Sequence, residues 1–298
     1  MFRTLAALIE RRGDVTHAFG ALDNWHFLTT LGRRPLVYTA VVPSAGPDLD
    51  LWRRISTIVV ESDRDARSVI HAGVAPSRVR LVYPGIDLNR FVPSPPPTGR
   101  FRLLFASSPA SVSEFEPRGI PLLVELARRH RDVDVVVLWR RWGNEHEAMH
   151  ALRALRPPGN FSIEYLGDRE MPDVYARAHA VVCLFGDGFG KSCPNSIVEA
   201  LACGRPVLVS ETCGLAGLVE QSGAGLTTSR AVSDVSTRLT ELRDRYRNFN
   251  ARDTATAHFD VRRFREAYDA IYDDAMHDTR AVDADAIVAA SEATTRGA

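Results

Sequence analysis

The stretch Phe185-Gly-Asp-Gly-Phe-Gly-Lys-Ser-Cys-Pro-Asn-Ser-Ile-Val-Glu-Ala-Leu-Ala-Cys-Gly-Arg-Pro-Val207 decides the fold of this chain of 298 residues. The apolar run from Ala180 to Phe185 favours a buried strand, and the glycines after it allow a tight loop. The residues from Ser196 to Cys203 have the apolar spacing of a helix, which Gly204-Arg205-Pro206 ends sharply before another apolar strand. Strand, loop, helix and strand in this order predict a βαβ unit with a parallel sheet.

The start of this helix has the features of an anion-binding site. Asn195 is a favoured N-cap residue, and Pro194 stops the helix from extending back into the loop. The first amides of a helix have no partner within it and carry the positive end of its dipole, a suitable place for a diphosphate. We expect these exposed amides to be those of Ser196, Ile197 and Val198.

Three side chains near the helix start extend this hypothesis. Lys191 and Ser192 stand directly ahead of the cap, where a cation and a hydroxyl suit a phosphate. Glu199 lies about one turn inside the helix, close enough to accept hydrogen bonds from a ribose whose phosphates sit at the helix end.

Other interpretations of the segment fit less well. Gly190-Lys191-Ser192 resembles the end of a P-loop, but the first glycine of that pattern would fall on Phe185, and Cys193-Pro194 would interrupt the required helix. The glycines at 186, 188 and 190 lack the spacing of a dinucleotide fingerprint. A strand-to-helix turn without any ligand remains open from the spacing alone.

The rest of the chain alternates between apolar strand-like runs and segments of helical period, which predicts an α/β fold with parallel sheets. Strands are expected at Val15 to Phe19, Pro35 to Val42, Thr57 to Val60, Arg80 to Tyr83, Phe101 to Ala106, Val133 to Trp139, Phe161 to Leu166 and Pro206 to Ser210. Helices are expected at Phe2 to Arg12, Trp25 to Leu31, Ile120 to Arg129, Glu145 to Leu155, Met171 to Ala178 and Val261 to Ala275. Ser62 or Asp63 is expected to cap a further helix that ends near Ala72.

A proline-rich segment at residues 92–100 has the composition of a linker. We therefore predict a first domain over residues 1–95 and a second over 96–260. A helix at 261–276 is expected to pack back toward the first domain, and the polar tail at 277–298 is expected to be disordered.

Composition excludes several functional classes. Lys and Arg together number 37, as do Asp and Glu, so no overall charge attracts nucleic acid. No apolar run reaches the roughly 20 residues of a membrane helix, and the charged N-terminus does not match a signal peptide. A cytoplasmic location is therefore expected, with peripheral association at the inner membrane face left open. The four cysteines lack the close pairing of zinc ligands, so we expect reduced thiols and no zinc site among them.

Glu199-Ala-Leu-Ala-Cys-Gly-Arg-Pro-Val-Leu-Val-Ser210 resembles the second half of the Glu-x7-Glu signature of family 4 GT-B glycosyltransferases, also called glycosyl transferases group 1. Other segments similar to this family follow in its order along most of the chain. They are 82–91, 161–167 with 171–175, 214–220 and 223–225.

The resemblance implies a GT-B-like fold of two Rossmann-like parallel-sheet domains and assigns roles to several residues. Glu199 would hold the ribose of the sugar donor, and the amides near Ser196 would hold its diphosphate. Arg118, where the family often has Lys-Gly, would neutralise the leaving group, a role in which electrostatic stabilisation is usually the largest catalytic contribution. Leu166 and Met171 would lie on the side of the nucleobase.

This chain departs from the family at four places. Lys191 stands where the first glutamate of the signature would be, and Ser107-Ser108 replaces a Gly-Arg pair, so Lys191 is a candidate for the missing phosphate cation. His17 matches the first histidine of an acceptor-side motif, while Phe19 stands where the second would be. The first three strands of the usual first domain, with its glycine-rich acceptor loop, have no counterpart, so that domain is expected to be incomplete, with four strands and an unprotected edge.

These observations predict a retaining glycosyltransferase that uses a nucleoside diphosphate sugar and neither a metal nor a cofactor. Its catalytic residues would be Arg118, Lys191, Glu199 and, with weaker support, His17, and its acceptor a glycan, a lipid-linked sugar or a small molecule. The main alternative is a non-catalytic nucleotide-sugar-binding subunit whose first sheet is completed by a partner chain or by self-association. An epimerase of related fold fits less well, because such enzymes use acidic residues of the segment without a counterpart here.

Overall fold

A computed structural model describes residues 2–20, 34–42, 52, 55–141, 143 and 145–277. The predicted helix at 25–31, the loop at 43–50 and the tail beyond 277 lie outside the described residues. The fold consists of two compact units. Unit 1 comprises Met1–Val82 together with the chain from Phe264 onward, and unit 2 comprises Tyr83–Arg263.

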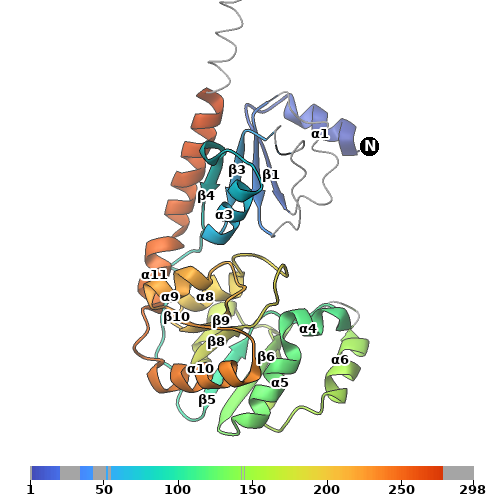
Figure 1. The fold of residues 1–298 in the computed structure, drawn as a ribbon, viewed down its shortest axis with the longest axis vertical. Helices are drawn as coiled ribbons and strands as arrows, with labels where there is room; N and C mark the ends of the chain where they lie inside the picture. Colours follow the sequence, from blue (N-terminus) through green and yellow to red (C-terminus); the bar gives the residue numbers. More distant parts are fainter. Residues whose placement is uncertain are drawn as a thin grey trace, which may run out of the picture. The chain divides into compact units, whose positions relative to one another are not determined.

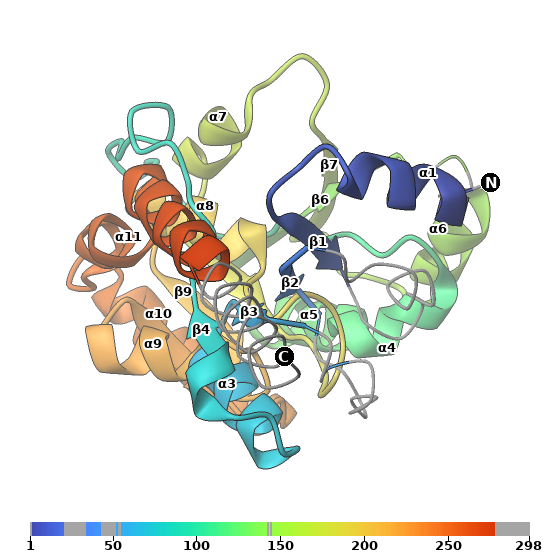
Figure 2. The same cartoon turned by 90° about the horizontal axis from the view of Figure 1, so that it is seen from above.

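Unit 1 is built on a parallel sheet with the strand order β1-β2-β3-β4. Figure 2 shows the four strands side by side from β1 to β4, with α3 next to β4. The strand bounds are β1 (Thr16–Gly20), β2 (Leu36–Ala40), β3 (Thr57–Val60) and β4 (Val79–Leu81). These are the four strands expected from the sequence, with β4 starting and ending slightly earlier than predicted.

Alternating side chains of this sheet are buried on opposite faces, as the period of a strand requires. On one face Tyr38 and Ile58 pack with Val69 of α3 (Asp63–His71). On the other face Val37 packs with Ile271, which belongs to a helix over residues 261–277. Among the described residues, the unit also contains the helices α1 (Phe2–Glu10) and the short η3 (Pro76–Arg78).

The predicted cap of α3 is confirmed. Ser62 is the N-cap, and its hydroxyl oxygen accepts a hydrogen bond of 3.1 Å from the amide of Asp65. The same hydroxyl donates to the carboxylate of Asp65 at 2.8 Å. One serine therefore satisfies an orphan amide of the first turn and fixes the start of the helix.

Unit 2 contains a six-stranded parallel sheet with the order β10-β9-β8-β5-β6-β7. The strand bounds are β5 (Phe101–Phe105), β6 (Val133–Trp139), β7 (Phe161–Tyr165), β8 (Ala180–Cys183), β9 (Val207–Ser210) and β10 (Gly225–Thr228). The helices are η4 (Val112–Glu114), α4 (Phe115–Arg118), α5 (Ile120–Arg129), α6 (Glu145–Ala154), α7 (Met171–Ala176), α8 (Asn195–Ala202), α9 (Ala216–Ser222), α10 (Val232–Arg245) and α11 (Ala251–His258). They pack on both faces of the sheet, as Figure 1 shows, which makes unit 2 a doubly wound domain.

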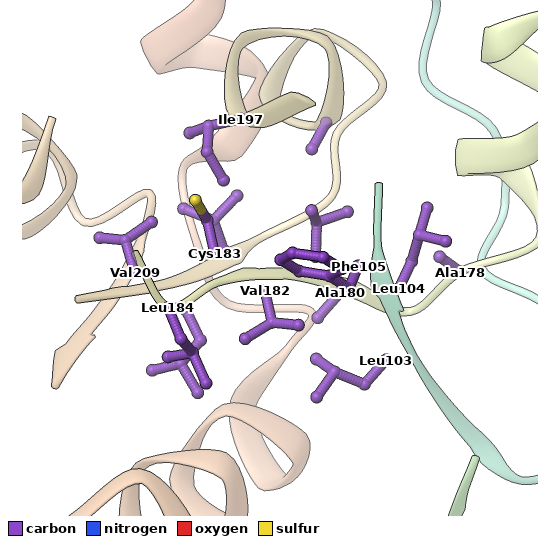
Figure 3. Close-up of a cluster of buried hydrophobic side chains, with 14 of the residues drawn as sticks. Leu103, Leu104, Phe105, Ala178, Ala180, Val182, Cys183, Leu184, Ile197 and Val209 are labelled. Carbon is purple, nitrogen blue, oxygen red and sulfur yellow. The ribbon is translucent and has the colours of Figure 1, made fainter. Parts of the chain in front are cut away.

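The core of unit 2 lies where α8 and α10 cover opposite faces of the central strands. In Figure 3, Ile197 of α8 points toward Cys183 on one face, while Val182 and Leu184 point to the other. All of these side chains are at most 1% exposed. The four cysteines, at positions 183, 193, 203 and 213, are buried thiols that form no disulfide.

The proline-rich segment at residues 92–100, predicted as the linker, belongs to unit 2. The guanidinium of Arg205, which is only 3% exposed, donates to the hydroxyl of Ser94 at 2.6 Å and to the carbonyl of Pro95 at 3.3 Å. Because a buried cation needs acceptors, it holds this segment against the domain. The division between the units falls at Tyr83, about ten residues before the prolines.

Among the described helices, none combines the length and apolar character needed to span a lipid bilayer.

Candidate functional site

The predicted site residues of unit 2 lie beyond the carboxyl ends of its parallel strands. Ser107 follows β5, Arg140 follows β6, and the glycine-rich loop at residues 186–190 follows β8. Ligands of open parallel sheets bind at this edge, because helix N-termini and loops gather there. The topology therefore brings segments that are far apart in sequence to one edge.

The start of α8 differs by one residue from the prediction. Pro194 is the N-cap, and Asn195 is the first helical residue. The amides of Ile197 and Val198 donate to the carbonyl of Pro194, at 3.0 Å and 3.3 Å. The expectation that these two amides are exposed is therefore wrong, since the carbonyl of the cap residue reaches both.

The amides of Asn195 and Ser196 remain available, because neither donates a hydrogen bond within the described part of the chain. Beside them, the hydroxyl of Ser192 is buried and has no hydrogen-bond partner among the described residues. The side chain of Lys191 donates to Oδ1 of Asn195 at 3.1 Å, which places its charge at the same helix end. Of the three predicted amides only that of Ser196 is available, and the amide of Asn195 joins it, together with the predicted hydroxyl of Ser192 and the predicted cation of Lys191.

The loop before α8 depends on glycine at two positions. Gly188 and Gly190 have φ values of 66° and 77°, a left-handed conformation that favours glycine. A Cβ at Gly190 would also lie 2.8 Å from the ring of Phe185. The carbonyl of Phe185 accepts hydrogen bonds of 2.7 Å from the hydroxyls of Ser210 and Thr212. The loop is therefore wrapped closely around an anchored aromatic residue.

Glu199 is held by a residue that sequence analysis did not single out. The phenol of Tyr175 in α7 donates a hydrogen bond of 2.8 Å to Oε2 of Glu199. Oε1 accepts no hydrogen bond from the described residues. Burial raises the pKa of Glu199, and the hydrogen bond from Tyr175 and the charges of Arg90 and Arg140 act against that rise. One carboxylate oxygen is thus fixed while the other is available to a ligand.

Arg118 lies at the same edge of the sheet, and an ion pair with Glu114 compensates part of its charge. Its Nε donates to Oε2 of Glu114 at 2.7 Å, and its Nη1 donates to the hydroxyl of Ser107 at 2.8 Å. The guanidinium lies 5.4 Å from the ring centre of Phe185 and 5.2 Å from that of Phe189. Two aromatic faces and three acceptors, which include the carbonyl of Ser107 at 3.2 Å from Nη1, hold Arg118 beside the glycine-rich loop, while its Nη2 donates to no acceptor within the described residues.

The two serines at positions 107 and 108 position other groups. Ser107 orients Arg118, as described above, and the hydroxyl of Ser108 accepts a hydrogen bond of 2.9 Å from the amide of Arg140. The supporting roles of Glu114 and Ser107 were missed by sequence analysis. Only the spacing of Glu114 and Arg118, four residues apart, could have suggested their ion pair.

Leu166 and Met171 belong to the segment that follows β7, the edge strand of the sheet. Leu166 directly follows β7 and is 36% exposed, whereas Met171 starts α7 and packs against the main hydrophobic core. Next to them, Arg141 lies 4.8 Å from the ring centre of Tyr165. The nucleobase role of Leu166 and Met171 stays a prediction.

His17 belongs to unit 1 and is engaged through both ring nitrogens. Nδ1 lies 2.6 Å from the phenol oxygen of Tyr272, and Nε2 lies 2.8 Å from Oγ1 of Thr39. Burial lowers the pKa of His17 to about 4, so the ring is neutral near pH 7. Thr39 in turn bonds the phenol of Tyr268 at 2.7 Å, so His17 takes part in an internal network that joins β1 and β2 to the helix at 261–277.

No cluster of three or more His, Cys, Asp or Glu residues with a geometry suited to a metal ion occurs in the part of the chain that the structure describes.

Residues 110–244 match the family described as Glycosyl transferases group 1. Two curated relatives are both named D-inositol 3-phosphate glycosyltransferase. The protein of Mycobacterium sp. (strain JLS) is 27% identical over 175 residues, covering 56% of this chain and 40% of the relative. The protein of Kribbella flavida is 29% identical over 189 residues, covering 57% of this chain and 43% of the relative. The chain thus spans less than half the length of these curated relatives.

Solved structures share the two-sheet architecture at low sequence identity. A glycosyltransferase from Rickettsia africae has a TM-score of 0.76 and 14% identity, with coverage of 92% of this chain and 80% of that one. Anabaena HepE in complex with UDP-glucose has a TM-score of 0.68 and 18% identity, with coverage of 90% and 81%. A GtfA/B complex has a TM-score of 0.66 and 12% identity, with coverage of 93% and 60%. These likenesses confirm the predicted GT-B-like fold, with its smaller first sheet.

Proposed function

We propose, because residues 110–244 match the family described as Glycosyl transferases group 1, that the protein transfers a sugar from a nucleoside diphosphate to an acceptor hydroxyl. The acceptor class is a saccharide, a lipid-linked sugar or a small molecule. The observation that supports this best is the start of α8, where the amides of Asn195 and Ser196 and the buried hydroxyl of Ser192 have no hydrogen-bond partner among the described residues. A buried hydroxyl without a partner is costly, and a diphosphate could accept hydrogen bonds from this hydroxyl and from the two amides.

The proposed reaction places new negative charge at this helix end. The acceptor oxygen bonds to the anomeric carbon of the sugar, the bond from that carbon to the diphosphate breaks, and the acceptor hydroxyl loses its proton. The leaving nucleoside diphosphate gains one negative charge, which the α8 amides, Lys191 and Arg118 would stabilise. In this proposal the sugar nucleotide is the substrate, neither a metal nor a cofactor takes part, and the anomeric configuration is retained.

Glu199 would bind the ribose of the sugar donor. Tyr175 occupies Oε2 of Glu199, and Oε1 accepts no hydrogen bond from the described residues, so Oε1 is suited to accept from ribose hydroxyls. A ligand hydroxyl favours the charged carboxylate, which offsets part of the burial penalty on its ionised form.

Binding of nucleoside diphosphates tests the proposal first. A ligand at about 100 times its Kd should raise the free energy of unfolding by about 2.7 kcal/mol, which a thermal-shift assay with UDP, GDP and ADP would detect. Release of free nucleoside diphosphate from the matching sugar donor then tests turnover. The Glu199→Ala variant should lose most of the diphosphate binding and most of the turnover. The Glu241→Ala variant, on the surface of α10, should keep both the binding and the turnover. A wild-type protein that binds none of these diphosphates would contradict the proposal.

A second candidate function is a non-catalytic nucleotide-sugar-binding subunit that acts with a partner chain. The engagement of both nitrogens of His17 favours this candidate, because that ring has no nitrogen left to accept a proton from an acceptor. The GtfA/B complex, named as an assembly of two proteins, has a similar fold. A binding subunit would bind the diphosphate without releasing it from any sugar donor until a partner is added, whereas an enzyme would turn over alone.

A further inference from the structure

Arg230 has an unusual backbone conformation beside the candidate site. It follows β10 by two residues and has a φ of 68°, and Arg156 is the other non-glycine residue with positive φ in the described part of the chain. This left-handed conformation carries a steric penalty that glycine avoids. Strained residues that persist are held by their surroundings, so the contacts of Arg230 should explain the conformation.

The side chain of Arg230 reaches two segments that follow other strands. Its Nη2 donates a hydrogen bond of 2.7 Å to the carbonyl of Glu116 and lies 3.8 Å from the Glu116 carboxylate. Its Nη1 is so close to Gly186 that a Cβ there would lie 3.0 Å from it. The amide of Gly186 in turn donates to the carbonyl of Pro117 at 2.7 Å. The segments that follow β5, β8 and β10 therefore meet at one guanidinium.

These contacts link Arg230 to Arg118 through the backbone. Pro117 directly precedes Arg118, and Gly186 directly follows Phe185, whose ring lies under the Arg118 guanidinium. A displacement of the turn at Glu116 and Pro117 would move both the cation and its aromatic support.

We propose that Arg230 is a positioning residue, which braces the 115–118 turn against the glycine-rich loop and so sets the place of Arg118. Its Nη2 is already committed to Glu116, and its side chain is only 22% exposed, which suits a brace better than a phosphate ligand. The flat guanidinium can lie against Gly186 and bond Glu116 at once, which the single ammonium of a lysine cannot do. This inference rests on the proposed function, in which Arg118 meets the diphosphate.

Hydrogen exchange tests the brace without any ligand. Arg230→Gly removes the guanidinium and relieves the backbone strain, and Arg156→Gly does the same at an exposed position away from the site. We expect the amide of Gly186 to exchange at least tenfold faster in Arg230→Gly, and at the wild-type rate in Arg156→Gly. Unchanged exchange at Gly186 in Arg230→Gly would overturn the brace.

Binding of the nucleoside diphosphate identified for the wild type tests the consequence. Arg230→Gly and Arg230→Lys should each raise its Kd about tenfold, and Arg156→Gly should leave it unchanged. In the Arg118→Ala background, the Arg230→Gly change should add less than twofold, because it acts through Arg118. Independent effects that multiply would overturn the positioning role. A wild-type protein without diphosphate affinity would instead refute the proposed function, while the exchange of Gly186 would still decide the brace.

Discussion

The phenol oxygen of Tyr175 donates a hydrogen bond of 2.8 Å to Oε2 of Glu199 and so joins α7 to α8. Tyr175 is fully buried, and burial, followed by the neighbouring carboxylate of Glu199, raises the pKa of its phenol well above the usual value. The tyrosine therefore stays a neutral hydrogen-bond donor over the working pH range. The hydrogen bond from Tyr175 lowers the pKa of Glu199, and a mutation can test this direction.

Replacing Tyr175 by Phe keeps the ring in the core and removes the hydrogen bond. Because that bond lowers the pKa of Glu199 against the effect of burial, its loss should raise this pKa further. As the solution is made more acidic, the affinity for the nucleoside diphosphate should then begin to fall at a higher pH than in wild type. Calorimetric titrations between about pH 5 and 8 would measure this acid limb of the affinity profile. Tyr246→Phe, at the end of α10, serves as the control. An acid limb that stays in place would contradict the assigned role.

The Glu199→Gln variant should separate stability from binding. Burial raises the pKa of Glu199 in the folded state, so the folded protein holds this proton more tightly than the unfolded chain. The stability that this proton contributes is present at low pH and is lost as pH rises through the unfolded value toward the folded one. Near pH 8 the ligand-free variant should therefore resist urea at least as well as wild type, while its Kd for the diphosphate rises at least tenfold. Joint loss of stability and affinity would argue for a purely structural glutamate.

Protonation of His17 in acid should lower the free energy of unfolding of unit 1. Burial lowers the pKa of His17 to about 4, whereas an unfolded histidine titrates near 6.5, so the unfolded chain binds more protons between these values. The free energy of unfolding should consequently fall as pH decreases through this window, by about 1 to 2 kcal/mol once the partial exposure of the ring is allowed for. Urea unfolding at several pH values measures this slope. His17→Gln should flatten it, and His146→Gln, exposed on α6, should leave it unchanged.

Gly119 should tolerate no side chain. It joins α4 to α5 with a φ of 77°, and a Cβ there would lie 2.8 Å from both the Cβ and the carbonyl oxygen of Leu184. Gly119→Ala should cost about 2 to 4 kcal/mol of unfolding free energy, from strain and crowding together. Gly99→Ala is the matched control, because Gly99 has a φ of 98° and open space around its Cα, so it should show the strain alone. Equal losses in the two variants would refute the close packing against Leu184.

Much of the fold follows from local patterns that the sequence displays. The bounds of β3, α5 and β6 were predicted to the residue, because each is a short apolar or periodic segment between clear breakers. The late elements β10, α9, α10 and α11 are not assigned from the sequence, since β10, α9 and α11 are short and α10 is rich in polar residues, which hides its apolar period. The sequence places the domain boundary in the proline-rich segment, whereas the two compact units divide at Tyr83, and composition cannot reveal that Arg205 binds this segment.

The sequence by itself determined the parallel α/β architecture, the glycine-rich loop before α8 and the residue types gathered there, since strand and helix periods and turn residues are local properties. Only the tertiary structure decided which of these groups are available to bind a ligand. The partners of Glu199 and Arg230 lie 24 and 114 residues away, and those of His17 lie 22 and 255 residues away. Hydrogen bonds over such separations depend on how strands are ordered in a sheet, and local sequence patterns do not encode that order.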